Sequence, residues 1–142
     1  MRISDVIRRK GNLVVTVRSD LTVLRLLEVL DEHHIGAVVV SDDGSSVTGI
    51  VSERDVVRHL HLVGVGVLKD TVAKIMTSDV QTCTPEDGVE DLARTMTDLR
   101  IRHVPVVHDG KLLAIVSIGD IVKSRIDELQ VERDHLVGYI QQ

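Results

Sequence analysis

Aromatic side chains are almost missing from this sequence of 142 residues. Phenylalanine and tryptophan are absent, and Tyr139 is the single tyrosine. Proteins that bind RNA or single-stranded nucleic acid stack the bases on aromatic rings, and nucleic-acid binders usually carry a basic face. The formal net charge here is −5. The composition therefore argues against direct binding of a nucleic acid.

Cysteine and long apolar segments are also scarce. Cys83 is the single cysteine, so no internal disulfide can form, which is natural for a reducing compartment. The first residues contain no apolar stretch of the kind found in a signal peptide. No apolar run approaches the ~20 residues that span a bilayer. We therefore expect a cytoplasmic protein with no membrane association.

What the sequence does contain is an aliphatic core, because apolar residues make up 43% and consist almost entirely of valine, leucine and isoleucine. Two segments in it follow one plan: a β-branched run, a serine, two variable residues, an aspartate and another aliphatic pair. The polar pairs are Ser52 with Asp55, and Ser117 with Asp120. Each falls where a strand should end and a helix begin, a place that favours anionic oxygen ligands. Helix capping would explain one isolated copy; two copies favour a binding role.

The rest of the chain repeats in the same order. A constant shift in numbering superposes Thr16 on Thr82, Leu26 on Leu92 and Ile35 on Ile101, which indicates an internal repeat. Each copy predicts a short helix, a strand, a helix and a two-stranded hairpin followed by a helix. The ranges expected are helices over 3–10, 20–34, 53–62, 72–76 and 85–99, and strands over 13–17, 35–40, 47–51, 80–83, 101–107 and 112–116.

Two β-α-β-β-α units, each too small to bury its own sheet face, should pack on each other. We therefore predict an α/β (α+β) module with pseudo-twofold symmetry and a long C-terminal helix. The domain organisation expected is repeat 1 over 3–62, a connector over 63–71, repeat 2 over 72–125 and a helical extension over 126–142.

Three motifs in register resemble a tandem pair of cystathionine-β-synthase (CBS) domains, often called a Bateman module, of the small stand-alone bacterial type. The resemblance covers about residues 3–125. Its carriers are Gly49-Ile50-Val51-Ser52-Glu53-Arg54-Asp55, Ala114-Ile115-Val116-Ser117-Ile118-Gly119-Asp120 and Arg102-His103-Val104-Pro105-Val106-Val107.

The resemblance implies a regulatory protein, not an enzyme, that binds an adenosine-containing ligand such as AMP, ADP, ATP or NAD between its repeats and requires no other cofactor. Asp55 or Asp120 would accept the ribose hydroxyls, and Ser52 or Ser117 would face a phosphate or ribose oxygen. Arginine donors would bind phosphates. The remaining residues that the resemblance implies for the ligand are Thr16, Val17, Ile35, Gly36, Ala37, Arg54, Thr82, Cys83, Arg102, His103, Val104 and Pro105.

The two sites should differ. Glu53 and Arg54 stand between Ser52 and Asp55, whereas Ile118 and Gly119 stand between the second serine and aspartate. The first site therefore offers a phosphate partner and the second a neutral floor, so one site is expected to bind a charged nucleotide better than the other.

Two readings besides nucleotide sensing stay open: a structural dimerisation module without a ligand, and a metal-binding stress protein suggested by seven histidines. No catalytic constellation or Walker loop is visible in the sequence. Adjacent and i,i+2 histidines such as His33-His34 and His59 with His61 do not share a helix face, so they are not preorganised chelates.

The C-terminal helix should present an apolar seam, which we call the α-seam, made of Val122, Ile126, Leu129, Leu136 and Ile140 and interrupted by Arg133. This seam could dock on the chain's own module or on a second copy. The short helices should add outward apolar side chains. We therefore expect a homodimer that signals to an unidentified protein, with Leu24, Leu27, Val57, Leu60, Leu92 and Met96 on its contact faces.

Overall fold

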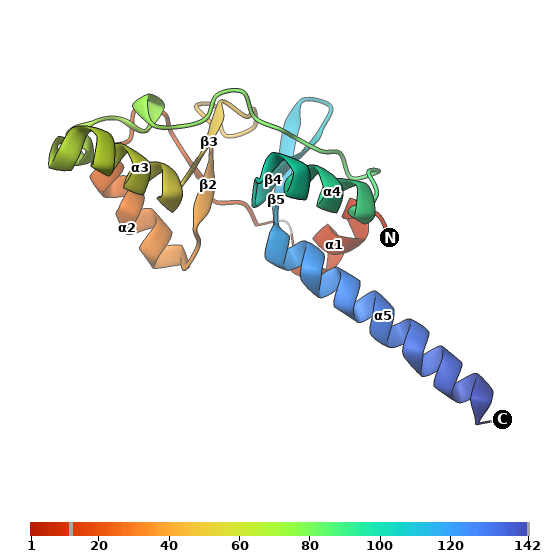
Figure 1. The fold of residues 1–142 in the computed structure, drawn as a ribbon. Coiled ribbons are helices and arrows are strands. Elements are labelled where there is room, and N and C mark those ends of the chain that lie inside the picture. Colours follow the sequence, from red (N-terminus) through yellow and green to blue (C-terminus); the bar gives the residue numbers. More distant parts are fainter. Residues whose placement is uncertain (12, 142) are drawn as a thin grey trace.

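The protein consists of two small α/β halves placed side by side, with one long helix that leaves the body (Figure 1). A computed structural model describes residues 1–11 and 13–141. The first half carries α2, α3, β2 and β3, and the second carries α1, α4, β4 and β5 (Figure 1). This is the mixed helix and strand architecture with a long C-terminal helix that the sequence predicted.

The first half is built on a three-stranded sheet. β1 (Thr16–Val17) runs parallel to β2 (Ala37–Val40), and β2 pairs antiparallel with β3 (Gly49–Ser52). α2 (Val23–His33) joins the first two strands, and α3 (Glu53–Val63) follows the third. All of β2 is buried because it is the central strand. In the pairing of β2 with β3, Ala37 lies opposite Ser52, so the start of β2 lies beside the start of α3.

The second half repeats this plan with two strands. α4 (Val89–Leu99) leads into β4 (His103–His108), which pairs antiparallel with β5 (Lys111–Ser117). The segment between α3 and α4 contains two short 3-10 helices, η1 (Gly64–Lys69) and η2 (Val72–Lys74). The short helix that the sequence predicted over 72–76 is η2, which ends at Lys74.

The strand expected over 80–83 is wrong, because only a parallel bridge between Cys83 and Val106 forms. The N–H of Cys83 donates to the carbonyl of Pro105 (3.0 Å), and the Cys83 carbonyl accepts from the N–H of Val107 (2.8 Å). Extending this ladder toward Gln81 would require an N–H on Pro105. Proline has none, so the pairing stops after one residue.

The two halves have separate cores, and each core is completed by a segment of the other repeat. Ile3 and Val6 of α1 (Ile3–Lys10) are buried in the core of the second half. Val72 and Ile75, from the start of the second repeat, are buried in the core of the first. Separating the halves would expose both sets of side chains to water, so burial of this apolar surface holds the halves together.

The apolar side chains expected on outward faces do not all face solvent. Leu24 of α2, expected on such a face, is 52% exposed, and the helix buries Val23, Leu26 and Leu30. In α4, Leu92 and Met96 lie in the core, and Leu99 is exposed. The expectation that Leu92 and Met96 form an outward contact face is therefore wrong, because both side chains fill the space between α4 and its own sheet.

α5 (Ile118–Ile140) is a single helix that packs on the second half only through its first turns. Ile121 and Ser124 are buried, and Arg9 on α1 pairs with Asp127 at 3.2 Å. Beyond these contacts the helix projects from the body (Figure 1). The five apolar α-seam residues are between 49% and 79% exposed, so the seam is not docked on the chain's own module.

Candidate functional site

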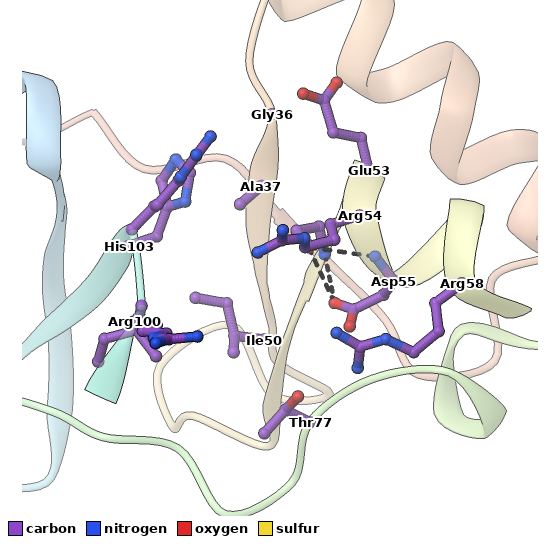
Figure 2. A pocket seen from close by; sticks show the side chains of 13 residues that line it. Gly36, Ala37, Ile50, Glu53, Arg54, Asp55, Arg58, Thr77, Arg100 and His103 are labelled. Atoms are coloured by element: carbon purple, nitrogen blue, oxygen red, sulfur yellow. Dashed lines mark hydrogen bonds between the residues drawn. The ribbon is translucent and has the colours of Figure 1, made fainter. Parts of the chain in front are cut away.

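A cleft of about 340 Å³ lies between the two halves, and we call it the Asp55 cleft. Figure 2 shows side chains of the first half on one wall and side chains of the second half on the other. The volume falls within the ~300–1,000 Å³ of typical small-molecule sites. Its lining comprises Gly36, Ala37, Ile50, Ser52, Glu53, Arg54, Asp55, Arg58, Thr77, Arg100, Ile101, Arg102 and His103.

Ser52 and Asp55 are held rigidly at the junction of β3 and α3. The Ser52 N–H donates to Asp55 Oδ2 (2.8 Å), and the Asp55 N–H donates to the Ser52 hydroxyl oxygen (3.3 Å). This reciprocal capping box satisfies helix-terminal N–H groups and fixes both rotamers. No residue of the described chain donates a hydrogen bond to Asp55 Oδ1. The carboxylate therefore keeps an acceptor for a ligand hydroxyl.

Four arginines line the cleft, two from each half. Arg54 and Arg58 stand one turn apart on α3, which places both on one side of that helix. Arg100 and Arg102 come from the short link between α4 and β4. Figure 2 shows Arg100 and His103 across the cleft from Arg54 and Arg58. Planar guanidinium groups from opposite walls can surround a phosphate chain with charge-assisted hydrogen bonds.

Arg100 is placed by an unusual backbone conformation. It ends α4 with φ of 54°, and His34 ends α2 with φ of 53°. This left-handed conformation is the usual way to terminate a helix, but it is favourable only for glycine and costs other residues roughly 1–2 kcal/mol. The backbone of Arg100 is therefore strained, and from this position its side chain lines the cleft.

Small residues keep the cleft open near the sheet. A side chain on Gly49 would come within 2.9 Å of the Thr77 carbonyl oxygen, so the tight contact between β3 and Thr77 requires glycine. A Cβ atom on Gly36 would approach Glu53 Oε1 to 3.3 Å. Gly36, Ala37 and Ile50 line the cleft and form a low, largely aliphatic floor suited to a flat ring.

His103 lies at the end of β4 that reaches the cleft. Burial, reinforced by the positive charges of Lys10 and Arg102, lowers the pKa of His103 below its ordinary value, and Asp120 and Glu53 act in the opposite direction. Its ring is therefore neutral at physiological pH. A neutral imidazole contributes one donor and one acceptor to the cleft rather than a fifth positive charge.

The second carboxylate, Asp120, is in a different environment. It forms the same capping box, with the Ser117 N–H donating to Asp120 Oδ2 at 2.9 Å. The ammonium of Lys10 also donates to Asp120 Oδ2 (2.7 Å). Burial acts to raise the pKa of Asp120, but the hydrogen bonds from Lys10 and Ser117 outweigh it and lower the pKa. Asp120 is thus an ionised carboxylate paired within the protein.

The structure brings seven of the residues expected to bind the ligand into the Asp55 cleft. These are Gly36, Ala37, Ser52, Arg54, Asp55, Arg102 and His103. Ile35 lies beside it in a shallow neighbouring pocket with Gly36 and Glu53. The other expected residues do not line the Asp55 cleft: they are Thr16, Val17, Thr82, Cys83, Val104, Pro105, Ser117 and Asp120.

Most of the residues outside the cleft have structural positions. Val17 pairs with β2, Cys83 pairs with β4, and both are buried, as are Val104 and Pro105. Burial, with a smaller effect from Asp87, raises the pKa of the Cys83 thiol to about 12. A thiol in this state is neutral, so Cys83 packs as a small apolar side chain.

Sequence reasoning missed six lining residues: Ile50, Glu53, Arg58, Thr77, Arg100 and Ile101. One signal for Arg58 was available, because it follows Arg54 by one helical turn. Arg100 stands at the end of a helix close to Arg102, which the motif had already placed at the site. Thr77 reaches the cleft because the chain after η2 crosses beside β3, a path that no local pattern predicts.

Comparisons with known proteins agree with this architecture. The sequence profile of the CBS domain matches residues 3–62 and 72–127. The mitochondrial CBS domain-containing protein CBSX3 of Arabidopsis thaliana is 36% identical over 98% of this chain and 71% of its own length. The crystal structure of the CBS-domain containing protein ATU1752 from Agrobacterium tumefaciens has a TM-score of 0.85 and 42% identity, covering 88% of this chain and 99% of that one.

A second similar structure contains ligands. The CBS domain pair of protein MJ0100, solved in complex with 5′-methylthioadenosine and S-adenosyl-L-methionine, has a TM-score of 0.77 and 25% identity and covers 87% of this chain and 98% of that one. The matched repeats, the paired halves and the cleft between them agree with one another. This chain therefore belongs to the CBS domain family, as a tandem pair of CBS domains.

Proposed function

We propose that this protein is a regulatory module that binds a phosphorylated adenosine ligand in the Asp55 cleft and passes its bound state to a protein partner. The observation that carries the proposal is the cleft's combination of a carboxylate on a helix start with four arginines from two opposing walls. A carboxylate flanked by guanidinium groups matches the diol and the phosphates of a nucleotide.

Each part of such a ligand has a complementary surface in the cleft. Asp55 Oδ1 accepts from the ribose hydroxyls, and the backbone N–H groups and positive end of α3 favour the nearest phosphate. The arginines neutralise further phosphates. The aliphatic floor of Gly36, Ala37 and Ile50 receives the purine.

The adenosine part of the proposal draws support from MJ0100, whose CBS pair was solved with two adenosine compounds. Both of those ligands lack phosphate groups. The four arginines of the Asp55 cleft favour a ligand that carries phosphates, so AMP, ADP, ATP and NAD are the first candidates. We propose no catalytic activity, since the arrangement offers recognition groups and not an activated nucleophile.

The protein partner that we propose is a second copy of this chain, and the contact surface is the α-seam. The seam follows heptad spacing, and Arg133 occupies one of its core positions. In an antiparallel pair with Ile126 facing Leu129 of the second copy, Arg125 faces Glu132 at the flank. Opposite charges then meet on both sides of the twofold axis, which favours self-association over other partners.

A thermal-shift panel of AMP, ADP, ATP, NAD, NADH and S-adenosylmethionine tests the proposal. A ligand present at a hundredfold excess over its dissociation constant should stabilise the protein by about 2.7 kcal/mol. Saturable stabilisation by one or more phosphorylated ligands is expected. If none of the six ligands raised the melting temperature, a structural dimerisation module without a ligand would be the better description.

The structure also bears on the metal-binding alternative. Within residues 1–11 and 13–141, no three His, Cys, Asp or Glu side chains converge to form a metal site. The ring of His59 directs its Nδ1 to the Asp55 carbonyl oxygen at 2.9 Å.

The helices of the same residues also bear on a membrane span, and none of them has the length and apolar character needed to cross a bilayer.

A further inference from the structure

The repeat places two equivalent carboxylates in the molecule, but their surroundings differ. Asp55 and Asp120 both close a capping box on the serine three residues earlier. Asp55 opens into the cleft between the halves. Asp120 is covered by a residue from a distant part of the sequence, Lys10 at the end of α1.

Lys10 makes two short hydrogen bonds at this place. Its ammonium donates to Asp120 Oδ2 and to the carbonyl oxygen of Ile115, both at 2.7 Å. In the first half, the counterpart of Ile115 is Ile50, whose carbonyl accepts from the backbone N–H of Thr77 at 2.9 Å. A backbone contact in one half is therefore replaced in the other by a charged side chain that also reaches the carboxylate.

The lysine is delivered to Asp120 by a well-anchored helix. Ile3 and Val6 are buried in the second core, and the Ile3 N–H donates to the Asp87 carbonyl oxygen at 2.9 Å. Arg9 pairs with Asp127 on α5 at 3.2 Å. These contacts hold both ends of α1 against the second half, so Lys10 is not a freely moving surface side chain.

The ion pair is also partly shielded from water. The side chains of Lys10 and Asp120 are 34% and 24% exposed. Charge-assisted hydrogen bonds are stronger than neutral ones, and screening by solvent weakens them less when they are partly buried. A ribose diol offers only neutral donors, and the Lys10 ammonium already neutralises the charge of the Asp120 carboxylate through Oδ2, so this carboxylate is a weaker acceptor for the diol than Asp55.

We infer that Lys10 acts as an internal latch that closes the Asp120 site, so that each chain binds one nucleotide, at Asp55. This inference rests on the proposed function, and it explains the expected difference in nucleotide binding between the two sites by the contact of Lys10 with Asp120. Lys10 neutralises the Asp120 carboxylate by its contact with Oδ2. Removing its charge releases the carboxylate and adds a second, weaker site for a nucleoside.

Isothermal titration calorimetry with AMP tests the latch. We expect one AMP per unaltered chain and two per chain of Lys10→Met. Lys10→Gln, which keeps a hydrogen-bond donor for the Ile115 carbonyl but lacks the charge, should also bind two. Arg8→Met is the matched control, because Arg8 is on the same helix with its side chain 78% exposed, and it should bind one.

A double variant identifies the second site. Lys10→Met combined with Asp120→Asn should return the stoichiometry from two to one, while occupation of the Asp55 cleft shows that the protein is folded. Two AMP per unaltered chain, or one AMP per chain in both Lys10 variants, would overturn the latch and leave the proposed function standing. If neither the unaltered chain nor any variant bound AMP, ADP, ATP or NAD, the proposed function itself would fail.

Discussion

Asp55 and Asp120 occupy the same position in equivalent helix starts, and each accepts a hydrogen bond from the N–H of the serine three residues before it, at 2.8 and 2.9 Å. The local motif therefore has the same geometry in both repeats. The charges around the two carboxylates differ: four arginines line the cleft of Asp55, of which only Arg54 belongs to the motif, and Lys10 pairs with Asp120. The proposed function depends on this difference.

The carboxylate variants should separate binding from stability. Asp55→Ala should weaken the binding of adenosine ligands roughly 10- to 100-fold, because it removes charge-assisted hydrogen bonds worth about 1.5–3 kcal/mol. Asp120→Ala should leave the affinity of the Asp55 cleft nearly unchanged. Both variants lose a capping partner and should become about 1 kcal/mol less stable, as measured by urea unfolding. Equal affinities of the two variants, measured by calorimetry on folded protein, would refute the assignment of the ligand to Asp55.

The phosphate role of Arg54 gives a second prediction. Arg54→Ala should lower the affinity for ATP about tenfold or more and change the affinity for adenosine little, because the lost guanidinium contacts only the anion. Arg25→Ala is a suitable control, since Arg25 lies on α2 and pairs with Glu28 away from the cleft. An equal loss for ATP and adenosine would show that Arg54 does not bind phosphate.

Much of the site was predictable because its central residues are local in sequence. Ser52, Arg54 and Asp55 lie within one turn of a helix start, and strand-to-helix signals predict that junction. Arg102 and His103 belong to the recognised motif of the second repeat. The two motifs face each other because the halves pack with pseudo-twofold symmetry, as expected from units too small to fold alone.

Other features could not be inferred from local patterns. Lys10 and Asp120 are 110 residues apart in sequence, and their contact depends on α1 packing against the second half. The face of α4 was mistaken for a different reason. The spacing of Leu92 and Met96 predicts that they share one face of the helix, but periodicity alone does not tell whether that face packs on the chain's own sheet or on a second copy, and both side chains are buried in the core.

Glycine substitutions at the left-handed ends of α2 and α4 should both raise stability, but only the substitution at Arg100 should weaken ligand binding. Arg100→Gly should stabilise the unliganded protein by about 1 kcal/mol, because glycine adopts positive φ without the Cβ penalty. It should also weaken ATP binding by removing a guanidinium from the cleft. His34→Gly relieves the same strain outside the cleft, so it should stabilise the fold and leave ATP affinity unchanged. Loss of stability in both glycine variants would contradict the strain argument.

His103 should report the charges of both sites. Its pKa, measured by NMR titration of the imidazole, should lie below 6.5 in the unliganded protein. Lys10→Met should raise this pKa and Asp120→Asn should lower it, because the first change removes a positive neighbour and the second a negative one. Since the unfolded chain binds a proton more readily than the folded one, the contribution of neutral His103 to stability is present above pH 6.5 and is lost as pH falls. If the pKa of His103 did not change in Lys10→Met, the claim that His103 senses the charge of Lys10 at the Asp120 site would be wrong.

The last prediction concerns assembly through the α-seam. Leu129 is 49% exposed near the middle of the seam, and it would be buried in a pair of α5 helices. The unaltered protein should therefore be a homodimer, with a mass near twice 15.7 kDa by light scattering. Leu129→Lys should shift it toward monomer, because burying an unpaired ammonium at a helix contact is costly.

Val131 supplies the matched control for this experiment. It is on the same helix and is 53% exposed, but it lies off the seam, on the side that faces α1 beside Asp127 and Asp134. A lysine there stays outside the α-seam contact, so Val131→Lys should remain dimeric. A monomer for the unaltered chain at micromolar concentration would refute the dimer. If Leu129→Lys stayed dimeric, the contact would instead lie on the exposed apolar side of α3, where Val57 and Leu60 are 66% and 40% exposed.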